Sequence, residues 1–562
     1  MNHITRQLII LLLLPLATAC TTPPQPQSQT RPEHAAIATA HPLATEAGHE
    51  ILSRGGNAFD AAVAVAAALA VVEPWNSGLG GGGFFLLHRA RDGFETMIDA
   101  RERAPLAASR DMYLRNGQPL PALSIDGALA AGIPGTPAAL VQLAEKYGRL
   151  PLKQTLAPAI RFARDGFAVT PPYSKILLRQ HMRLTDHFPE AVRIYLKEGL
   201  VPAPGDIAKQ PELAQTLQQL ADNGRSGFYG GVTARRLVQG VRAAGGIWSL
   251  KDLADYRVVE REPVRGKYRG IRITSAALPS SGGVVLVQML NLLQGFDLDA
   301  MPKVQRAHTM IEAMHLAYRE RARHLGDPDF VRVDVPRLLD SAYAVELRKE
   351  IRAPQPGAAG APAKAAGGGA NTTHFSIIDR EGNRVAATLS LNTPFGSGFI
   401  PPGTGVVLNN QMDDFSVAPG VANTYGLTGG EANAIAPGKR PLSSMTPTFL
   451  ESDDAVVVLG TPGGSRIISM VLLATLEFAH GRGGPKEWVG LPRFHHQYLP
   501  DVVAHEERAF DAEERRLLQQ LGHRLEAVRD GYGNMQLVAW HKKDGRMGAA
   551  SDPRGEGRGL VR

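Results

Sequence analysis

The junction near residue 371 places a hydroxyl nucleophile at an unusual point in the chain. The sequence Asn371-Thr372-Thr373-His374 directly follows residues 353–370, which are mostly alanine, glycine and proline and offer little with which to build a core. A threonine hydroxyl can attack the carbonyl group before it, rearrange the peptide to an ester and, after hydrolysis, become a new N-terminus. Its α-amino group, with an ordinary pKa of about 7.7–8.0, can then act as the base for its own hydroxyl.

The same junction also fits a plain domain boundary, in which a solvated linker runs into a strand without any reaction. Residues 372–378 and 384–391 alternate in side-chain character and flank a turn at 379–383, which predicts a β-hairpin. Both interpretations therefore place Thr372 at the start of a core strand.

The chain before the junction is predicted to be mainly helical. Residues 58–72 are apolar on all sides and follow Asn57, a good N-cap, so they predict a buried helix. An apolar strand is expected at residues 84–87. Further helices are predicted at 137–147, 151–164, 211–222, 231–244, 305–324 and 340–352. After the junction we expect strands and glycine turns, with a helix near 511–521.

A glycine-rich run resembles a nucleotide-binding motif but has the wrong context. Gly78, Gly80 and Gly83 match the spacing G-x-G-x-x-G. A dinucleotide fingerprint requires a strand before it and a helix after it, and here the predicted order is reversed. We expect these glycines to allow close backbone packing or to form a loop near a site.

The predicted helix at 305–324 carries possible metal ligands. His308, Glu312 and His315 are spaced to share one helix face. No third strong ligand is evident nearby and no H-E-x-x-H motif is present. Polar groups at a packed interface explain them better, so we predict no metal and no cofactor.

Composition excludes several classes of protein. The 562 residues are 44% hydrophobic and 20% charged, which is typical of a large globular protein. The formal charge of +7 is mild for this length, and no basic block interleaved with aromatics supports nucleic-acid binding. The single cysteine, Cys20, excludes disulfide and cysteine-rich metal frameworks.

The N-terminus has the features of an export signal. Arg6 precedes a short apolar run, residues 8–14, and small residues lead to Cys20. The run is too short to span a bilayer, which takes about 20 residues. We predict a signal peptide at residues 1–19.

Two interpretations of Cys20 remain open. Small residues before a cysteine resemble a bacterial lipobox, in which Cys20 is lipidated and residues 20–38 form a flexible tether. Because Thr21, and not an aspartate, follows the cysteine, this predicts an outer-membrane lipoprotein. The alternative is ordinary cleavage after Ala19, which predicts a soluble periplasmic protein.

Several ordered motifs share one family pattern. Together they resemble the γ-glutamyltranspeptidase (glutathione hydrolase) family of N-terminal-nucleophile hydrolases, from about residue 40 to residue 554. The motifs are residues 55–62 (GGNAFDAA), 99–105 (DARERAP), 132–135 (GIPG), 326–328 (GDP), 372–374 (TTH), 408–416 (LNNQMDDFS), 439–445 (KRPLSSM), 461–466 (TPGGSR) and 551–554 (SDPR).

The resemblance implies a fold and an activity. The fold is an α+β, four-layer αββα sandwich whose precursor cuts itself between Asn371 and Thr372. The products are a large subunit, residues 39–371 with the flexible linker 353–371 at its end, and a small catalytic subunit, residues 372–562. The enzyme transfers the γ-glutamyl group of glutathione or a related amide to water, an amino acid or a dipeptide.

The resemblance also assigns the catalytic groups. Thr372 is the nucleophile, and the N–H groups of Gly463 and Gly464 hold the oxyanion. A second threonine usually contacts the nucleophile in this family. Here that position is Ser390, which keeps a hydroxyl, so we expect function with altered cleavage or turnover rates. From residue types alone, Gly463-Gly464 would pass as a tight turn.

The substrate-binding residues come from the same resemblance. Arg101 binds the α-carboxylate of the γ-glutamyl group through two parallel donors, and a carboxylate balances the α-ammonium. Residues 419–430 form a lid that gates the site. The full set is Arg101, Ser443 and Ser444 for the carboxylate, Asn392, Gln411 and Asp414 for the ammonium, and Tyr425 in the lid.

Three alternatives accompany this interpretation. The first two are a glutaryl or cephalosporin-type acylase and a capsule-acting transpeptidase with the same chemistry. Asp414 favours γ-glutamyl over glutaryl substrates, because acylase relatives tend to lose this carboxylate. The third is a non-catalytic envelope lipoprotein that kept the scaffold.

Overall fold

The computed structural model describes residues 31–351, 371–418 and 420–562. The predicted signal peptide, Cys20, residues 352–370 of the linker region and Pro419 of the lid lie outside these ranges. Strand β1 (Ala36–Thr39) is buried and begins inside the segment predicted as a tether, so the folded region starts before residue 39.

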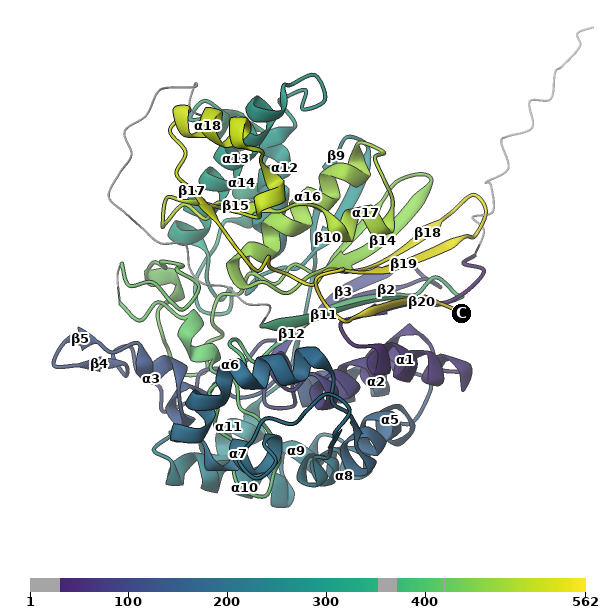
Figure 1. Ribbon diagram of the computed structural model, residues 1–562, viewed down its shortest axis with the longest axis vertical. Coiled ribbons are helices and arrows are strands. Elements are labelled where there is room, and N and C mark those ends of the chain that lie inside the picture. The colour runs from purple at the N-terminus through teal and green to yellow at the C-terminus, as the bar shows by residue number, and fades with distance from the viewer. Residues whose placement is uncertain (1–30, 352–370, 419) are drawn as a thin grey trace, which may run out of the picture.

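Two antiparallel sheets lie face to face between two helical layers (Figure 1), which confirms the αββα sandwich. The seven-stranded sheet has the order β20-β1-β11-β12-β2-β3-β8, with β2 Gly82–Arg89, β3 Phe94–Ala100, β8 Val259–Arg261, β11 Thr372–Ile378, β12 Arg384–Ser390 and β20 Arg558–Val561. The six-stranded sheet has the order β19-β18-β14-β13-β10-β9, with β9 Val264–Tyr268, β10 Ile271–Ser275, β13 Thr448–Glu451, β14 Ala455–Gly460, β18 Gln536–His541 and β19 Met547–Ser551.

The parts of the chain before and after residue 371 both contribute strands to each sheet. In the seven-stranded sheet, β11 and β12 pair between β1 and β2, which come from the first part. In the six-stranded sheet, β13 pairs with β10 across the same division. A cut at residue 371 would therefore leave both pieces held by backbone hydrogen bonds and a shared core.

The helical layers differ in origin. The layer over the seven-stranded sheet comes from the first part of the chain: α1 Pro42–Ser53, α2 Ala58–Val72, α4 Thr136–Gln142, α5 Leu152–Asp165, α6 Pro171–His187, α7 Pro189–Tyr195, α8 Pro211–Asn223, α9 Ser226–Tyr229, α10 Gly231–Ala243 and α11 Leu250–Asp255. The layer over the six-stranded sheet combines both parts: α12 Gly282–Leu293, α13 Lys303–His324, α14 Val335–Leu339, α15 Ser341–Arg348, α16 Ile467–Ala479, α17 Pro485–Gly490 and α18 Ala512–Gln520.

Successive side chains along a strand point alternately into two different hydrophobic cores. On β2, Phe85 and Leu87 join the cluster beneath the α1–α2 layer, whereas Phe84 and Leu86 face the space between the sheets. The predicted hairpin is confirmed, with Thr372 opposite Ser390 at its open end.

The predicted helix at 58–72 is confirmed, and α2 is buried over its whole length. The Asn57 side chain accepts hydrogen bonds from the backbone N–H groups of Phe59 and Asp60, and the Asp60 carboxylate accepts one from the Asn57 N–H, which completes a capping box. Because α2 packs against β11 and β12, it supports the hairpin that carries Thr372.

Most of the other predicted helices are present, with shifted ends. The segment at 137–147 is α4 followed by a π-helical turn, Leu143–Tyr147, and α15 ends at Arg348 where a helix to residue 352 was predicted. Several helices were not predicted, and those of twelve or more residues are α1, α6, α12 and α16.

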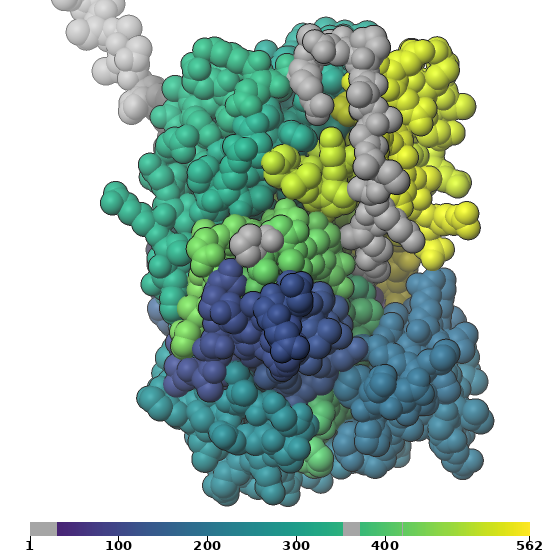
Figure 2. All heavy atoms as spheres, turned by 90° about the vertical axis from the view of Figure 1, so that its left-hand side faces the viewer, coloured from purple at the N-terminus to yellow at the C-terminus, as the bar shows by residue number. Residues whose placement is uncertain are grey.

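A short segment after β3 lies on the surface at one side of the molecule. Strands β4 (Leu114–Arg115) and β5 (Gln118–Pro119) and helix α3 (Ala122–Ile125) follow β3. In Figure 2 these dark-blue residues adjoin green residues of the loops after β12. The contact has its own apolar cluster, which includes Tyr113, Met412 and Phe415.

Candidate active site

Thr372 and Ser390 face each other at the open end of the β11–β12 hairpin. Their hydroxyl oxygens lie 3.0 Å apart and are buried. The Ser390 hydroxyl donates to the carbonyl oxygen of Asn371 at 3.0 Å and accepts the backbone N–H of Asn392 at 2.8 Å. A hydroxyl group has only one proton to donate. Because Ser390 donates it to the carbonyl oxygen of Asn371, Ser390 can only accept a hydrogen bond from the Thr372 hydroxyl.

The glycine run lies directly behind this pair. A Cβ at Gly81 would lie 2.2 Å from the carbonyl oxygen of Ser390, and one at Gly80 would lie 1.9 Å from that of Val407. The run therefore permits the close backbone packing predicted for it, because any side chain there would push the site residues apart.

One small cavity brings the predicted site residues together. It is lined by ten of the eleven predicted catalytic and substrate-binding residues, and the remaining one, Gly463, directly precedes the lining residue Gly464. The ten are Thr372, Ser390, Gly464, Arg101, Asn392, Gln411, Asp414, Ser443, Ser444 and Tyr425. Its volume of about 20 Å³ is room for little more than one water molecule, so a substrate requires the surrounding loops to move.

Arg101 and Asp414 form an ion pair at the floor of the cavity. Arg101 is fully buried, and its Nη2 donates to Asp414 Oδ2 at 2.5 Å. Its Nε donates to the carbonyl oxygen of Pro441 at 3.0 Å, which fixes the plane of the guanidinium group. Nη1 makes no hydrogen bond, although the Glu102 carboxylate lies 3.7 Å away.

Glu102 is buried beside the Arg101 guanidinium group. Burial raises the pKa of Glu102 to about 7, and the adjacent Arg101 opposes that rise. The guanidinium group thus lies between two carboxylates, Glu102 and Asp414, in a region without solvent.

Asp414 is held by side chains as well as by Arg101. Gln411 donates to its Oδ2 at 2.7 Å, and Asn423 donates to its Oδ1 at 3.0 Å. Burial raises the pKa of the neighbouring Asp413 to about 6, and the charge of Asp414 adds to the rise. Asp413 accepts from Ser124 and from the backbone N–H of Thr424, so it anchors the loop that contains Asn423.

A second arginine reaches the cavity. Arg321 on α13 is buried and donates to Ser444 Oγ at 3.2 Å and to Ser281 Oγ at 2.9 Å. Ser281 in turn donates to the carbonyl oxygen of Ser443 at 2.7 Å. Burial lowers the pKa of Arg321, yet its ordinary value is so high that the group stays cationic. Arg321 therefore adds positive charge beside the two serines.

Tyr425 closes the cavity over Gly464. A Cβ at Gly464 would lie 2.4 Å from Tyr425 Cδ1, so the ring lies flat against the backbone there. The phenol donates to the carbonyl oxygen of Asn392, and Gln497 donates to that of Tyr425 at 3.0 Å. Gly463 has φ 143° and Gly464 has φ 58°, a conformation that favours glycine.

The cavity combines a buried threonine hydroxyl with an oppositely charged pair of side chains, which are complementary to the head group of an α-amino acid. A profile of the γ-glutamyltranspeptidase family matches residues 44–561. The chain belongs to the γ-glutamyltranspeptidase family. It is an enzyme with γ-glutamyl hydrolase or transferase activity, which excludes a non-catalytic scaffold.

The similarity of the chain to individual proteins supports the same family assignment. The chain is 42% identical to the glutathione hydrolase proenzyme of Escherichia coli K12, over 93% of this chain and 91% of that protein. Among solved structures, a cephalosporin acylase from Bacillus halodurans superposes with a TM-score of 0.83 at 28% identity, covering 98% and 99% of the two chains. The γ-glutamyltranspeptidase of Helicobacter pylori gives 0.54 at 41% identity, covering 56% of this chain and 90% of that chain.

Sequence reasoning missed several side chains that complete the γ-glutamyltranspeptidase site. Arg321 lies five residues before the GDP motif on a correctly predicted helix, and Asn423 lies within the predicted lid. The polar side chains at these two positions were the sequence signal that could have identified them as site residues. Gln497 follows a histidine-rich stretch and gave no such signal.

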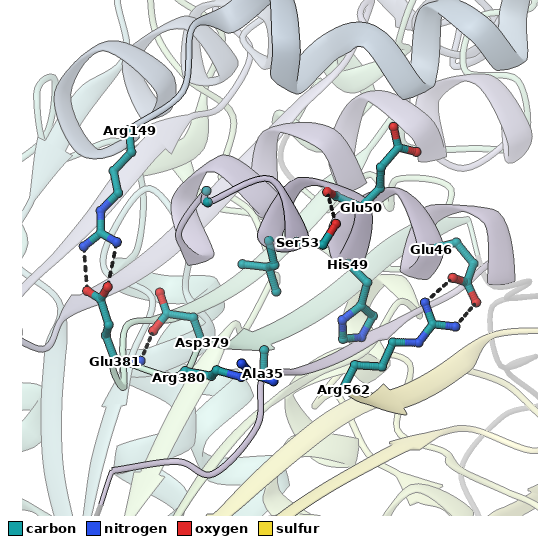
Figure 3. Close-up of a pocket in the computed structure, with 13 residues that line it drawn as sticks. Ala35, Glu46, His49, Glu50, Ser53, Arg149, Asp379, Arg380, Glu381 and Arg562 are labelled. Atoms are coloured by element: carbon teal, nitrogen blue, oxygen red, sulfur yellow. Dashed lines mark hydrogen bonds and ion pairs between the residues drawn. The ribbon is translucent and has the colours of Figure 1, made fainter.

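A larger cavity lies away from this site, at the turn of the same hairpin. It has a volume of about 590 Å³, and its charged side chains largely pair with one another: Arg149 with Glu381, and Arg562 with Glu46 (Figure 3). None of the predicted site residues lines it.

Proposed function

We propose that the precursor cuts its own Asn371–Thr372 bond and that Thr372 then transfers the γ-glutamyl group of glutathione or a similar amide to water, an amino acid or a dipeptide. The observation that carries this proposal is the contact of Ser390 with both the Thr372 hydroxyl and the Asn371 carbonyl. The same two groups must react if the bond is to break, because Thr372 Oγ1 has to attack the carbonyl carbon of Asn371.

Cleavage follows from that contact. As Thr372 Oγ1 attacks the carbonyl carbon, Ser390 gives its own proton to the Asn371 carbonyl oxygen and takes the Thr372 proton in its place, so Ser390 stays neutral and the tetrahedral intermediate carries a hydroxyl group that can later give its proton to the departing nitrogen. The C–N bond then breaks, the nitrogen is protonated to become the new α-amino group, and water hydrolyses the resulting ester.

In the mature enzyme, the substrate head group replaces the internal ion pair. Its α-carboxylate binds the Arg101 guanidinium group, with Ser443 and Ser444 as further hydrogen-bond donors. Its α-ammonium group binds the Asp414 carboxylate, together with Gln411 and Asn392. Thr372 Oγ1 attacks the γ-amide carbonyl and passes its proton to its own α-amino group. The Gly463 and Gly464 N–H groups stabilise the oxyanion, and the departing amine takes a proton.

We predict that Ser390→Ala slows maturation by at least about 100-fold, because the scissile carbonyl loses its donor and Thr372 loses its acceptor. Ser390→Thr keeps the hydroxyl and should still mature. The measurement is the fraction of cut chain against time on a denaturing gel. Wild-type maturation of Ser390→Ala would contradict the assigned role.

We predict that Gly464→Ala lowers kcat by about 100- to 1000-fold, because a methyl group would displace Tyr425 and tilt the oxyanion donors. Gly481→Ala is the matched control, since Gly481 also has positive φ, 65°, but no atom within 4 Å of the added methyl group. Hydrolysis of γ-glutamyl-p-nitroanilide measures both. Equal losses in the two variants would indicate backbone strain alone.

An acylase acting on glutaryl amides is the second candidate, favoured by the close superposition on the Bacillus halodurans acylase. Asp414 decides between the two, because a glutaryl group lacks the α-ammonium that this carboxylate would balance. We expect γ-glutamyl-p-nitroanilide to be cleaved far faster than glutaryl-p-nitroanilide. The reverse preference would establish the acylase.

The proposed location is the bacterial cell envelope. Within the described residues, no helix is both long and apolar enough to cross a bilayer. Export rests on the sequence of residues 1–19, and an outer-membrane anchor rests on lipidation of Cys20. Mass spectrometry of the purified protein distinguishes a lipidated Cys20 from ordinary cleavage after Ala19.

A further inference from the structure

Outside the active site, three side chains with metal-binding atoms meet between α13 and the segment after α18. His308 and Glu312 lie one turn apart on α13, and His523 follows α18. Their ligand atoms all lie within 4.8 Å of one another, and the side chains are buried. The prediction that no third ligand lies near His308 was wrong, because His523 is 215 residues away in the sequence.

We propose that this cluster binds a divalent transition-metal ion of the Zn²⁺ class. The ligands are His308 Nδ1, His523 Nε2 and one Glu312 carboxylate oxygen, with water in a fourth position. Two imidazoles and one carboxylate form a donor set that suits Zn²⁺ in tetrahedral geometry. The sequence also places His315 on this helix, but the structure assigns it to a different group.

The observed geometry needs a small adjustment to hold the ion. His308 Nδ1 and His523 Nε2 lie 2.7 Å apart and share one hydrogen bond. An ion with bonds of about 2.0–2.1 Å holds two tetrahedral nitrogens about 3.3 Å apart, so the rings must separate by about 0.6 Å. The ring that donates that hydrogen bond must carry its proton on its other nitrogen, because each ligand nitrogen needs a free lone pair.

A second group, which includes His315 of the same helix, also combines two histidines with one carboxylate but has the wrong proton arrangement. His315, His496 and Asp501 also place their ligand atoms within 4.8 Å. However, His496 Nδ1 accepts the backbone N–H of Tyr498 at 3.2 Å, which places the proton of the neutral ring on Nε2. That is the atom facing Asp501 at 2.9 Å, so it has no lone pair for a metal. This group is therefore a matched control.

An ion can approach the His308 group from one side. His308 lines a cavity of about 440 Å³ together with Thr309, Gln305, Arg348 and Lys349. The two cations there oppose a metal ion, whereas the buried Glu312 carboxylate attracts it at short range. We therefore expect slow loading and tight retention, in place of rapid exchange.

The site would join the two parts of the chain. His308 and Glu312 precede residue 371 and His523 follows it, so after the proposed cleavage the ion would bridge the subunits. The bridging consequence rests on the proposed function, whereas metal binding does not. One ion pair, Lys303 to Glu514 at 3.7 Å, already links α13 to α18. Arg321 lies thirteen residues beyond His308, or about 20 Å along the helix, so the ion would stabilise the protein without joining in catalysis.

The test is Zn²⁺ binding by full-length protein that has been stripped with a chelator and dialysed. We expect one bound equivalent, measured by elemental analysis, and a rise in Tm on adding Zn²⁺ alone. Co²⁺ in place of Zn²⁺ should give the visible absorption of a tetrahedral site. His523→Ala should weaken binding by more than about 100-fold, since losing even a group that only orients a ligand costs 10- to 100-fold.

His496→Ala should bind as the wild type does, and His523→Gln provides a second variant if His523→Ala fails to fold. The uncut Thr372→Ala protein should bind Zn²⁺ normally, which separates this proposal from the proposed cleavage. No bound equivalent in the wild type, equal binding by folded His523 variants, or loss of binding in His496→Ala would each overturn the site.

Discussion

Thr372→Ala is expected to yield a single uncut polypeptide without γ-glutamyl activity. The substitution removes the atom that we propose attacks the Asn371 carbonyl, and no other hydroxyl described in the structure is both beside that carbonyl and able to form a new N-terminus by attacking it. Because the fold assembles before cleavage, the variant should have near-native stability. A denaturing gel, a thermal melt and hydrolysis of γ-glutamyl-p-nitroanilide measure the three outcomes.

Thr372→Ser is the matched variant for this experiment. It keeps a hydroxyl at the first position of β11, so it should still cut and retain measurable activity. Two subunits from Thr372→Ala would contradict the assignment of the nucleophile, and so would activity in its uncut chain.

Arg101→Ala is expected to raise KM strongly, with a smaller effect on kcat. Truncating a buried charged partner costs about 2–4 kcal/mol, which corresponds to a loss of roughly 30- to 700-fold in kcat/KM. In the proposed mechanism the guanidinium contacts the substrate head group in both the ground and transition states, so the loss should appear mainly in KM. Steady-state kinetics with γ-glutamyl-p-nitroanilide separate the two constants.

Arg103→Ala is the control for Arg101, because it removes another arginine of the same run. Its Nε donates to the carbonyl oxygen of Gly438, and it does not line the cavity. We expect little change in KM. Since Arg101→Ala also leaves Glu102 and Asp414 without their cation, a thermal melt should accompany the kinetics. An unchanged KM in a folded Arg101→Ala protein would exclude the carboxylate-binding role.

Local sequence patterns predicted the elements that position the nucleophile. Asn57 and the apolar residues after it specify α2 almost to the residue, because capping and burial act within a few positions. The hairpin with Thr372 opposite Ser390 follows from two alternating runs and a turn of fixed length. These features need no information from distant parts of the chain.

Contacts between distant segments could not be read in the same way. Arg321 and Ser444 are 123 residues apart, and only the packing of α13 beside the six-stranded sheet brings them together. The pairing of Arg101 with Asp414 was likewise not predicted: each residue was assigned to one end of the substrate, but not to the other residue. His523 joins His308 for the same reason, since the helix face alone shows only two of the three residues in the group.

The central claim is that Thr372 becomes a free N-terminus and supplies both the nucleophile and the base. N-terminal sequencing and intact mass of purified, active enzyme test it most directly. The account predicts two chains, of which the smaller begins Thr-Thr-His-Phe and has the mass of residues 372–562. Full activity in a preparation that contains only uncut chain, or a smaller chain that begins at any other residue, would contradict it.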